Sequence, residues 1–143
     1  MKGDAHDLER FGQAQEPVYR HVVEELRDGH KCSHWMWFVF PQLRGLGSSP
    51  TARHYGISGA DEARAYAAHP LLGRRLLECT RLVLAVRGRT ALEIFGTPDE
   101  LKFGSSMTLF DHVGAGREPA FAEALERFFA GRRDERTLAL LGR

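Results

Sequence analysis

Residues 97–110 read TPDELKFGSSMTLF, and this stretch decides the fold class of the sequence. Thr97 has a side chain that caps helices, and Glu100 has the spacing to reach back and complete a capping box. Pro98 stands at the first helical position, where its missing N–H costs nothing, and two carboxylates in this first turn favour the positive end of the helix dipole. We therefore predict a helix that continues to about Phe110.

Similar helix-start signals recur along the chain. Proline follows a capping residue at Ser49-Pro50, His69-Pro70 and Glu118-Pro119. Two further pairs have the spacing of a capping box, namely Ser58 with Asp61 and Thr90 with Glu93. Many starts within a short chain predict many short helices.

The ends of these helices are marked by glycine and proline. Apolar residues at helical spacing fill the segments between the starts, and helix ends are expected at Gly29, Gly88 and Gly131. Pro17 is expected to divide the N-terminal pattern into two helices, and a last short helix is expected over residues 134–141.

The length and the composition are those of a folded globular protein. The chain has 143 residues, of which 43% are hydrophobic and 27% charged, enough to bury one substantial core. The segment SHWMWFVF, residues 33–40, has a strand-like composition, but a single strand without a partner is not stable, so we assign it to a helix. We predict an all-α protein, a single compact multihelical domain over residues 1–143 with about eight to ten short helices and with residues 1–6 frayed.

Charge and hydropathy exclude several classes of function. Lys and Arg together number 20 against 19 Asp and Glu, so a net charge of +1 disfavours binding to nucleic acid through the overall field. The longest apolar run, residues 35–41, is far shorter than the ~20 residues that a membrane span needs, and the N-terminus carries no apolar signal region. Two cysteines do not make a disulfide framework. We expect a cytoplasmic protein with no membrane contact.

The most unusual stretch is residues 29–60, which carries three Lys or Arg and three histidines but no acidic residue. It also holds several aromatic residues and a loop rich in glycine and serine. An indole offers stacking, arginine offers a bidentate fork, and a glycine-rich backbone admits a phosphate, so the stretch favours a ligand with a flat ring and an anionic group. The alternative is that the aromatic residues belong to the core. The ligand-binding candidates here are Trp35, Trp37, Gln42, Arg44 and Tyr55.

A second wall of the same site is predicted at residues 102–108, KFGSSMT. Gly104 weakens a helix by ~1 kcal/mol, which indicates a close approach of another group to the backbone. Lys102 would supply a charge, and Ser106 or Thr108 would donate hydrogen bonds. The alternative is helix packing through small residues.

Two histidines are the candidates for catalysis. His34 and His69 each lie at a predicted helix boundary, and imidazole titrates near neutral pH, as general acid or base chemistry requires. The alternative is that these histidines cap helices or pack in the core. His30, Cys32 and His34 alternate along the chain, but a structural zinc site needs four ligands and no second pair is present, so we predict no metal and no cofactor.

One predicted helix and its end carry five arginines. They offer a face for a protein or a nucleic acid, whereas the alternative is a solvated helix face whose side chains cover apolar surface. The five are Arg74, Arg75, Arg81, Arg87 and Arg89.

Three motifs in this chain carry a family resemblance. They read GHKCSHWMWFVFPQLRGLGSS (29–49), HPLLGRRL (69–76) and FGTPDELKFGSSMTLF (95–110). They resemble the signature of the bacterial domain-of-unknown-function family 1810, and the resemblance continues to residue 141. It implies a compact multihelical domain and no established reaction.

Two functions from different classes are therefore predicted. The favoured one is a binding or hydrolytic domain for a phosphate-bearing ligand of the nucleotide or ADP-ribose type, with Trp35 or Trp37 stacking on its ring and with Arg44 and Lys102 holding its anion. The alternative is a protein-interaction module without catalysis, which would meet its partner through the arginine-rich helix or a helical groove.

Overall fold

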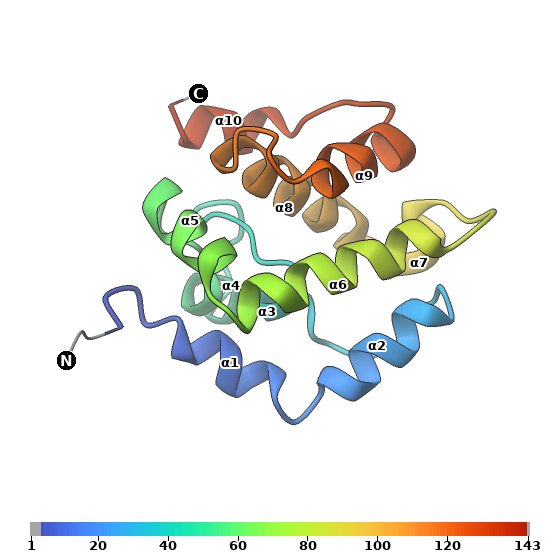
Figure 1. Cartoon of the computed structure of the whole chain (residues 1–143), viewed down its shortest axis with the longest axis horizontal. Coiled ribbons are helices and arrows are strands. Elements are labelled where there is room, and N and C mark those ends of the chain that lie inside the picture. Colours follow the sequence, from blue (N-terminus) through green and yellow to red (C-terminus); the bar gives the residue numbers. More distant parts are fainter. Residues whose placement is uncertain (1–3, 143) are drawn as a thin grey trace.

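The computed structural model describes residues 4–142 and shows an all-α protein (Figure 1). The expectation of an all-α fold is confirmed. The described residues form ten helices, α1 (Glu9–Gln15), α2 (Tyr19–Arg27), α3 (Met36–Val39), α4 (Pro50–Tyr55), α5 (Ala60–Ala68), α6 (Leu72–Ala85), α7 (Ala91–Phe95), α8 (Asp99–Val113), α9 (Pro119–Phe129) and α10 (Glu135–Leu140).

The expected fraying of residues 1–6 falls in part on residues 1–3, which lie outside the described residues. Asp4 is described, and its carboxylate accepts hydrogen bonds from the amides of Leu8 and Glu9, both at 2.8 Å. Asp4 is thereby tied to the start of α1.

Four predicted helix starts are confirmed with their caps. The Ser49 hydroxyl accepts from the amide of Ala52 at 3.1 Å, and Pro50 follows as the first residue of α4. Helix α7 begins with a complete capping box between Thr90 and Glu93. The carboxylates of Glu118 and Asp134 cap α9 and α10. Each of these caps satisfies an amide that a helix leaves without an internal partner.

The capping box predicted at Thr97 and Glu100 is wrong, although the helix is present. Helix α8 has Pro98 as its N-cap, and no side chain caps it. The amide of Glu100 donates to the carbonyl of Gly96 at 2.9 Å, so a backbone oxygen takes the place of the Thr97 hydroxyl. The helix also continues past Phe110 for one more turn.

Two further starts differ from the prediction. The amide of Ser58 donates to the carboxylate of Glu62 at 2.8 Å, so Glu62 and not Asp61 reaches back across the first turn of α5. Pro70 stands before α6 and not at its first position. The ring nitrogen Nδ1 of His69 accepts hydrogen bonds from the amides of Leu71 and Leu72 at the start of this helix. In both places a side chain outside the N-cap position binds the backbone amides at the start of the helix.

The aromatic segment 33–40 contains one helical turn, α3, and is otherwise irregular. The chain then passes through a single parallel bridge between Leu43 and Ile57, where the amide of Arg44 donates to the Ile57 carbonyl at 2.8 Å. This bridge closes the loop 44–56, which contains α4, and it holds the loop against the body of the protein.

Helix α8 is the centre of the packing. Ten of its residues between Phe103 and Val113 are buried, and it contacts α5, α7, α9 and α10 (Figure 1). Phe103 is fully buried, with the rings of Phe40 and Phe95 at centroid distances of 5.0 and 4.7 Å. The first turn of α8 and His112 near its end reach the surface, and the first turns form part of the cleft described below.

Among residues 4–142, no helix has both the length and the apolar character that crossing a membrane requires.

Candidate functional site

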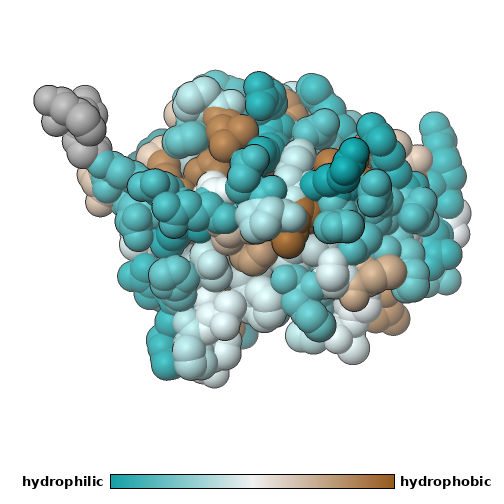
Figure 2. Space-filling view, turned by 90° about the horizontal axis from the view of Figure 1, so that it is seen from below, coloured by the Kyte–Doolittle hydropathy of each residue, from teal (hydrophilic) through white to brown (hydrophobic). Residues whose placement is uncertain are grey.

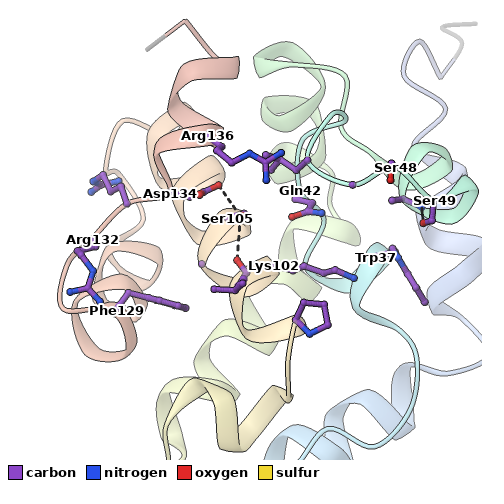
Figure 3. Close-up of a pocket in the computed structure, with 17 residues that line it drawn as sticks. Trp37, Gln42, Ser48, Ser49, Lys102, Ser105, Phe129, Arg132, Asp134 and Arg136 are labelled. Carbon is purple, nitrogen blue, oxygen red and sulfur yellow. Dashed lines mark hydrogen bonds between the residues drawn. The ribbon is translucent and has the colours of Figure 1, made fainter.

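A cleft of about 740 Å³ opens where four segments meet (Figure 3). They are the loop between α3 and α4, the first half of α8, the end of α9 and the link into α10. The residues that line the cleft are Trp37, Gln42, Leu46, Gly47, Ser48, Ser49, Ala52, Pro98, Leu101, Lys102, Gly104, Ser105, Phe129, Arg132, Arg133, Asp134 and Arg136.

The floor of the cleft is one face of α8. Leu101, Lys102 and Ser105 lie three and four residues apart, the spacing that places side chains on the same side of a helix. Gly104 belongs to this face, and a Cβ at that position would lie 3.1 Å from two ring carbons of Phe129. The predicted close approach at Gly104 is thus made by an aromatic ring from α9, which forms one end of the cleft.

Trp37 stands at the other end of the cleft. The Nζ atom of Lys102 lies 5.3 Å from the centroid of the Trp37 ring and 3.5 Å from Oδ1 of Asp99. The other oxygen of Asp99 is 2.8 Å from Nζ of Lys31, whose side chain is almost fully buried. Asp99 therefore joins two lysines and orients Lys102 toward the indole.

Three arginines follow α9 and line the opposite wall. Arg133 is paired with the buried carboxylate of Asp111 at 2.7 Å. Arg132 and Arg136 are exposed, and neither has a carboxylate partner among residues 4–142. In Figure 3, Arg136 extends from α10 toward the segment that carries Gln42, and Arg132 lies beside Phe129. This wall therefore presents two guanidinium groups that are free to pair with an anion.

Asp134, the only acidic residue among residues 4–142 that line the cleft, holds this wall in place through its hydrogen bonds. Its Oδ2 accepts hydrogen bonds from the Ser105 hydroxyl at 2.9 Å and from the Thr137 amide and hydroxyl. Its own amide donates to Thr108 Oγ1 at 3.0 Å. These bonds fix the arginine-bearing segment to α8.

The structure brings three of the predicted ligand-binding residues together in this cleft, namely Trp37, Gln42 and Lys102. Trp35 lies elsewhere: it is buried, and its indole nitrogen donates to Glu25 at 2.9 Å. Arg44 donates to the carbonyl of Gly56 and faces a different, polar hollow. The aromatic residues of the segment are thus divided between core and cleft.

The remaining predicted binding residues lie behind or beside the cleft. Tyr55 packs on Phe38 at a centroid distance of 5.3 Å and borders a narrow side hollow that also touches Trp37. Thr108 is fully buried and donates to the Gly104 carbonyl. Ser106 is also fully buried, and its hydroxyl has no hydrogen-bond partner among residues 4–142. Both buried hydroxyls belong to the packing of α8.

Neither predicted catalytic histidine lines the cleft. His34 is exposed in the loop before α3. His69 caps α6 through its Nδ1 atom, which lies 3.1 Å from each of two backbone amides. Among the described residues no group of three or more His, Cys, Asp and Glu side chains is arranged to hold a metal ion, and Cys32 Sγ lies 3.9 Å from His30 Nδ1 as an isolated contact.

The comparisons with known proteins identify the family and agree with the fold. A family model described as "Protein of unknown function (DUF1810)" matches residues 5–141. The chain belongs to this family. It is also similar to the crystal structure of the conserved hypothetical protein Rv1873 from Mycobacterium tuberculosis, with 59% identity and a TM-score of 0.94 over 98% of this chain and 99% of that one. No curated protein matches the chain.

The arginine-rich helix of this DUF1810 protein is mostly a solvated face. Arg75 lies over the ring of Tyr19 at 4.4 Å and is 3.2 Å from the carboxylate of Glu16. Arg74 and Arg81 are exposed beside a shallow hollow on α6. The face seen from below in Figure 2 is largely hydrophilic, and its hydrophobic residues are scattered in small patches.

Glu25 organises the loop that leads from α2 into the cleft. Its carboxylate accepts hydrogen bonds from the Ser33 hydroxyl at 2.5 Å, from the Cys32 and Ser33 amides, and from the Trp35 indole. Burial raises the pKa of Glu25, but these hydrogen bonds outweigh burial and lower the pKa to about 2. The folded state therefore prefers the ionised carboxylate.

We expect Glu25 to make folding sensitive to acid. Because its folded-state pKa is depressed, its contribution is complete above about pH 4.5 and is lost as the pH falls toward about 2. Glu25→Gln should lower the free energy of unfolding by roughly 2 kcal/mol at pH 7 and should flatten its pH dependence between pH 2 and 5. Urea unfolding across that range checks this, with Glu24→Gln as the exposed control. An equally steep pH dependence in Glu25→Gln would contradict the assignment.

Proposed function

We propose that the cleft binds a small ligand in which a flat ring is joined to a phosphate group, as in a nucleotide. One observation carries the proposal. Arg132 and Arg136, without carboxylate partners among residues 4–142, line the same cleft as the partly buried indole of Trp37. A ring-binding group and an anion-binding group thus share one cavity.

The charges that line the cleft suit a phosphate. Arginine binds phosphate oxygens through a planar fork of N–H donors, and lysine adds a point charge. Lys102 supplies that point charge, and the carboxylate of Asp134 is turned to Ser105 and Thr137 through its hydrogen bonds. The cleft therefore has a positive local charge although the chain as a whole has a net charge of only +1.

The remaining lining suits an aromatic ring. Trp37 is half-buried, and the apolar side chains of Leu46 and Leu101 lie in the same cavity. Stacking of a base on an indole contributes about 1–3 kcal/mol to the binding free energy, whichever base is bound. The cavity of about 740 Å³ also falls within the range typical of small-molecule sites, roughly 300–1,000 Å³.

We propose binding and assign no bond cleavage to the site. His34 and His69, the candidates for acid or base chemistry, lie outside the cleft. A general base has to lie within hydrogen-bond reach of the proton that it removes, directly or through one water.

A thermal-shift comparison of ADP, inorganic phosphate and adenosine tests the proposal. ADP at ~100 times its Kd should stabilise the protein by about 2.7 kcal/mol, which raises the melting temperature by several degrees. Adenosine and phosphate at the same concentration should each give a much smaller shift, because each fills only part of the cleft. An unchanged melting temperature with ADP, or an equal shift with adenosine, would contradict a site for ring and phosphate together.

A further inference from the structure

We propose, resting on the proposed function, that the preferred ligand is a dinucleotide, with two rings joined by a diphosphate. The inference comes from the two ends of the cleft. Trp37 and Phe129 lie at opposite ends in Figure 3, and each has a cation beside it, Lys102 and Arg132 respectively. A ligand with a single ring uses only one of these ends.

The two rings flank the floor of the cleft from different sides (Figure 3). Trp37 stands near Lys102, and Phe129 packs against Gly104, two residues further along α8. Because Trp37 and Phe129 lie on opposite sides of this floor in Figure 3, we infer that one base stacks on only one of the two rings.

The middle of the cleft is lined by cations. In Figure 3, Lys102 points from α8 and Arg136 from α10 into the space between the two aromatic residues. Ser105 lies on the floor between them, and its hydroxyl hydrogen is donated to Asp134 or to the Leu101 carbonyl. A diphosphate placed here would receive charge from both walls, while its two nucleosides would extend toward the two rings.

Gly104 allows the Phe129 ring to occupy its place at the second end of the cleft. A Cβ at position 104 would approach the Cε1 and Cζ atoms of Phe129 to 3.1 Å, tighter than about nine in ten such contacts, so the ring would have to shift by a few tenths of an ångström. The glycine thus costs helix stability but allows the Phe129 ring to lie close against α8. Arg132 lies beside this ring and has no carboxylate partner among residues 4–142.

The test compares NAD⁺ with AMP by isothermal titration calorimetry on the full chain. NAD⁺ should bind about tenfold more tightly than AMP, because it gains a second stack and a second phosphate contact. Trp37→Leu and Phe129→Leu should each weaken NAD⁺ binding by about fivefold or more, whereas AMP should be sensitive to only one of the two substitutions.

Gly104→Ala provides a second route to the same end of the cleft. It leaves Phe129 unchanged but shifts its ring, so it should weaken NAD⁺ binding in the same direction as Phe129→Leu and by a smaller factor. Gly12→Ala is the matched control, because it lies in α1 with open space around its Cβ and should leave binding unchanged. Melting temperatures of all variants establish that they are folded.

The outcomes separate this inference from the proposed function. Equal affinities for AMP and NAD⁺, or NAD⁺ binding that depends on Trp37 but is unaffected by both Phe129→Leu and Gly104→Ala, would overturn the dinucleotide and leave the nucleotide site intact. Failure of both ligands to bind would overturn the proposed function itself, and the inference with it.

Discussion

Replacing both Arg132 and Arg136 with glutamine is expected to weaken ADP binding about 100-fold. Hydrogen bonds to charged groups contribute about 1.5–3 kcal/mol each, and a loss of about 2.7 kcal/mol corresponds to a factor of 100 in Kd. Both side chains are exposed, so the substitutions should leave the melting temperature of the free protein almost unchanged. Calorimetric titration of the double variant with ADP measures the effect.

The control for this variant is Arg74→Gln combined with Arg81→Gln on α6. These two arginines are also exposed and lie outside the cleft, and replacing both with glutamine removes the same net charge. They should leave the Kd for ADP within about twofold, because exposed charges beyond a Debye length of ~10 Å are largely screened at 0.1 M salt. Equal losses in the two double variants would show that net charge and not the cleft determines binding.

Phe103→Ala is expected to reduce the free energy of unfolding by about 4 kcal/mol. Truncation of a buried phenylalanine costs about 3–5 kcal/mol, because burial is lost and a cavity is left. Phe103 is fully buried on α8, and its ring neighbours come from three other parts of the chain. These neighbours are Phe40, Phe95, Phe128 and Phe129.

Urea unfolding followed by circular dichroism measures this loss. Leu92→Ala serves as the control, because Leu92 is 53% exposed and its truncation should change stability by no more than about 0.5 kcal/mol. A loss below about 1.5 kcal/mol for Phe103→Ala would mean that α8 is not the centre of the packing.

Helix positions were predictable from the sequence because caps are local. The box between Thr90 and Glu93 depends on residues three positions apart, and it forms as predicted. The box expected between Thr97 and Glu100 has the same spacing but does not form, because the amide of Glu100 donates to the Gly96 carbonyl and not to the Thr97 hydroxyl. Spacing alone does not show which of two nearby acceptors an amide will use.

The candidate site was only partly predictable, because the cleft joins segments that are distant in the chain. Trp37, Gln42 and Lys102 were found from residue type and local composition. Trp35, two residues from Trp37, instead faces the core, and periodicity in an irregular segment does not separate the two indoles.

The arginines of the far wall were missed, although a signal for them exists in the sequence. The segment GRRDER, residues 131–136, places two arginines between α9 and α10 and a third in the first turn of α10, and loop side chains often face a cleft. Its position opposite Trp37 depends on how α9 packs on α8, and on the hydrogen bonds of Asp134 to Ser105 and Thr108. These are tertiary contacts that no local pattern encodes.

The central claim, that the cleft binds a ring and a phosphate together, is tested most directly by tryptophan fluorescence during titration with ADP. The chain has two tryptophans, of which Trp35 is buried in the core and Trp37 lines the cleft. We expect a saturable change in emission in the wild type, and its loss in Trp37→Phe, where Trp35 remains as an internal reporter. A saturable change that persists in Trp37→Phe, or no change in the wild type, would contradict the claim.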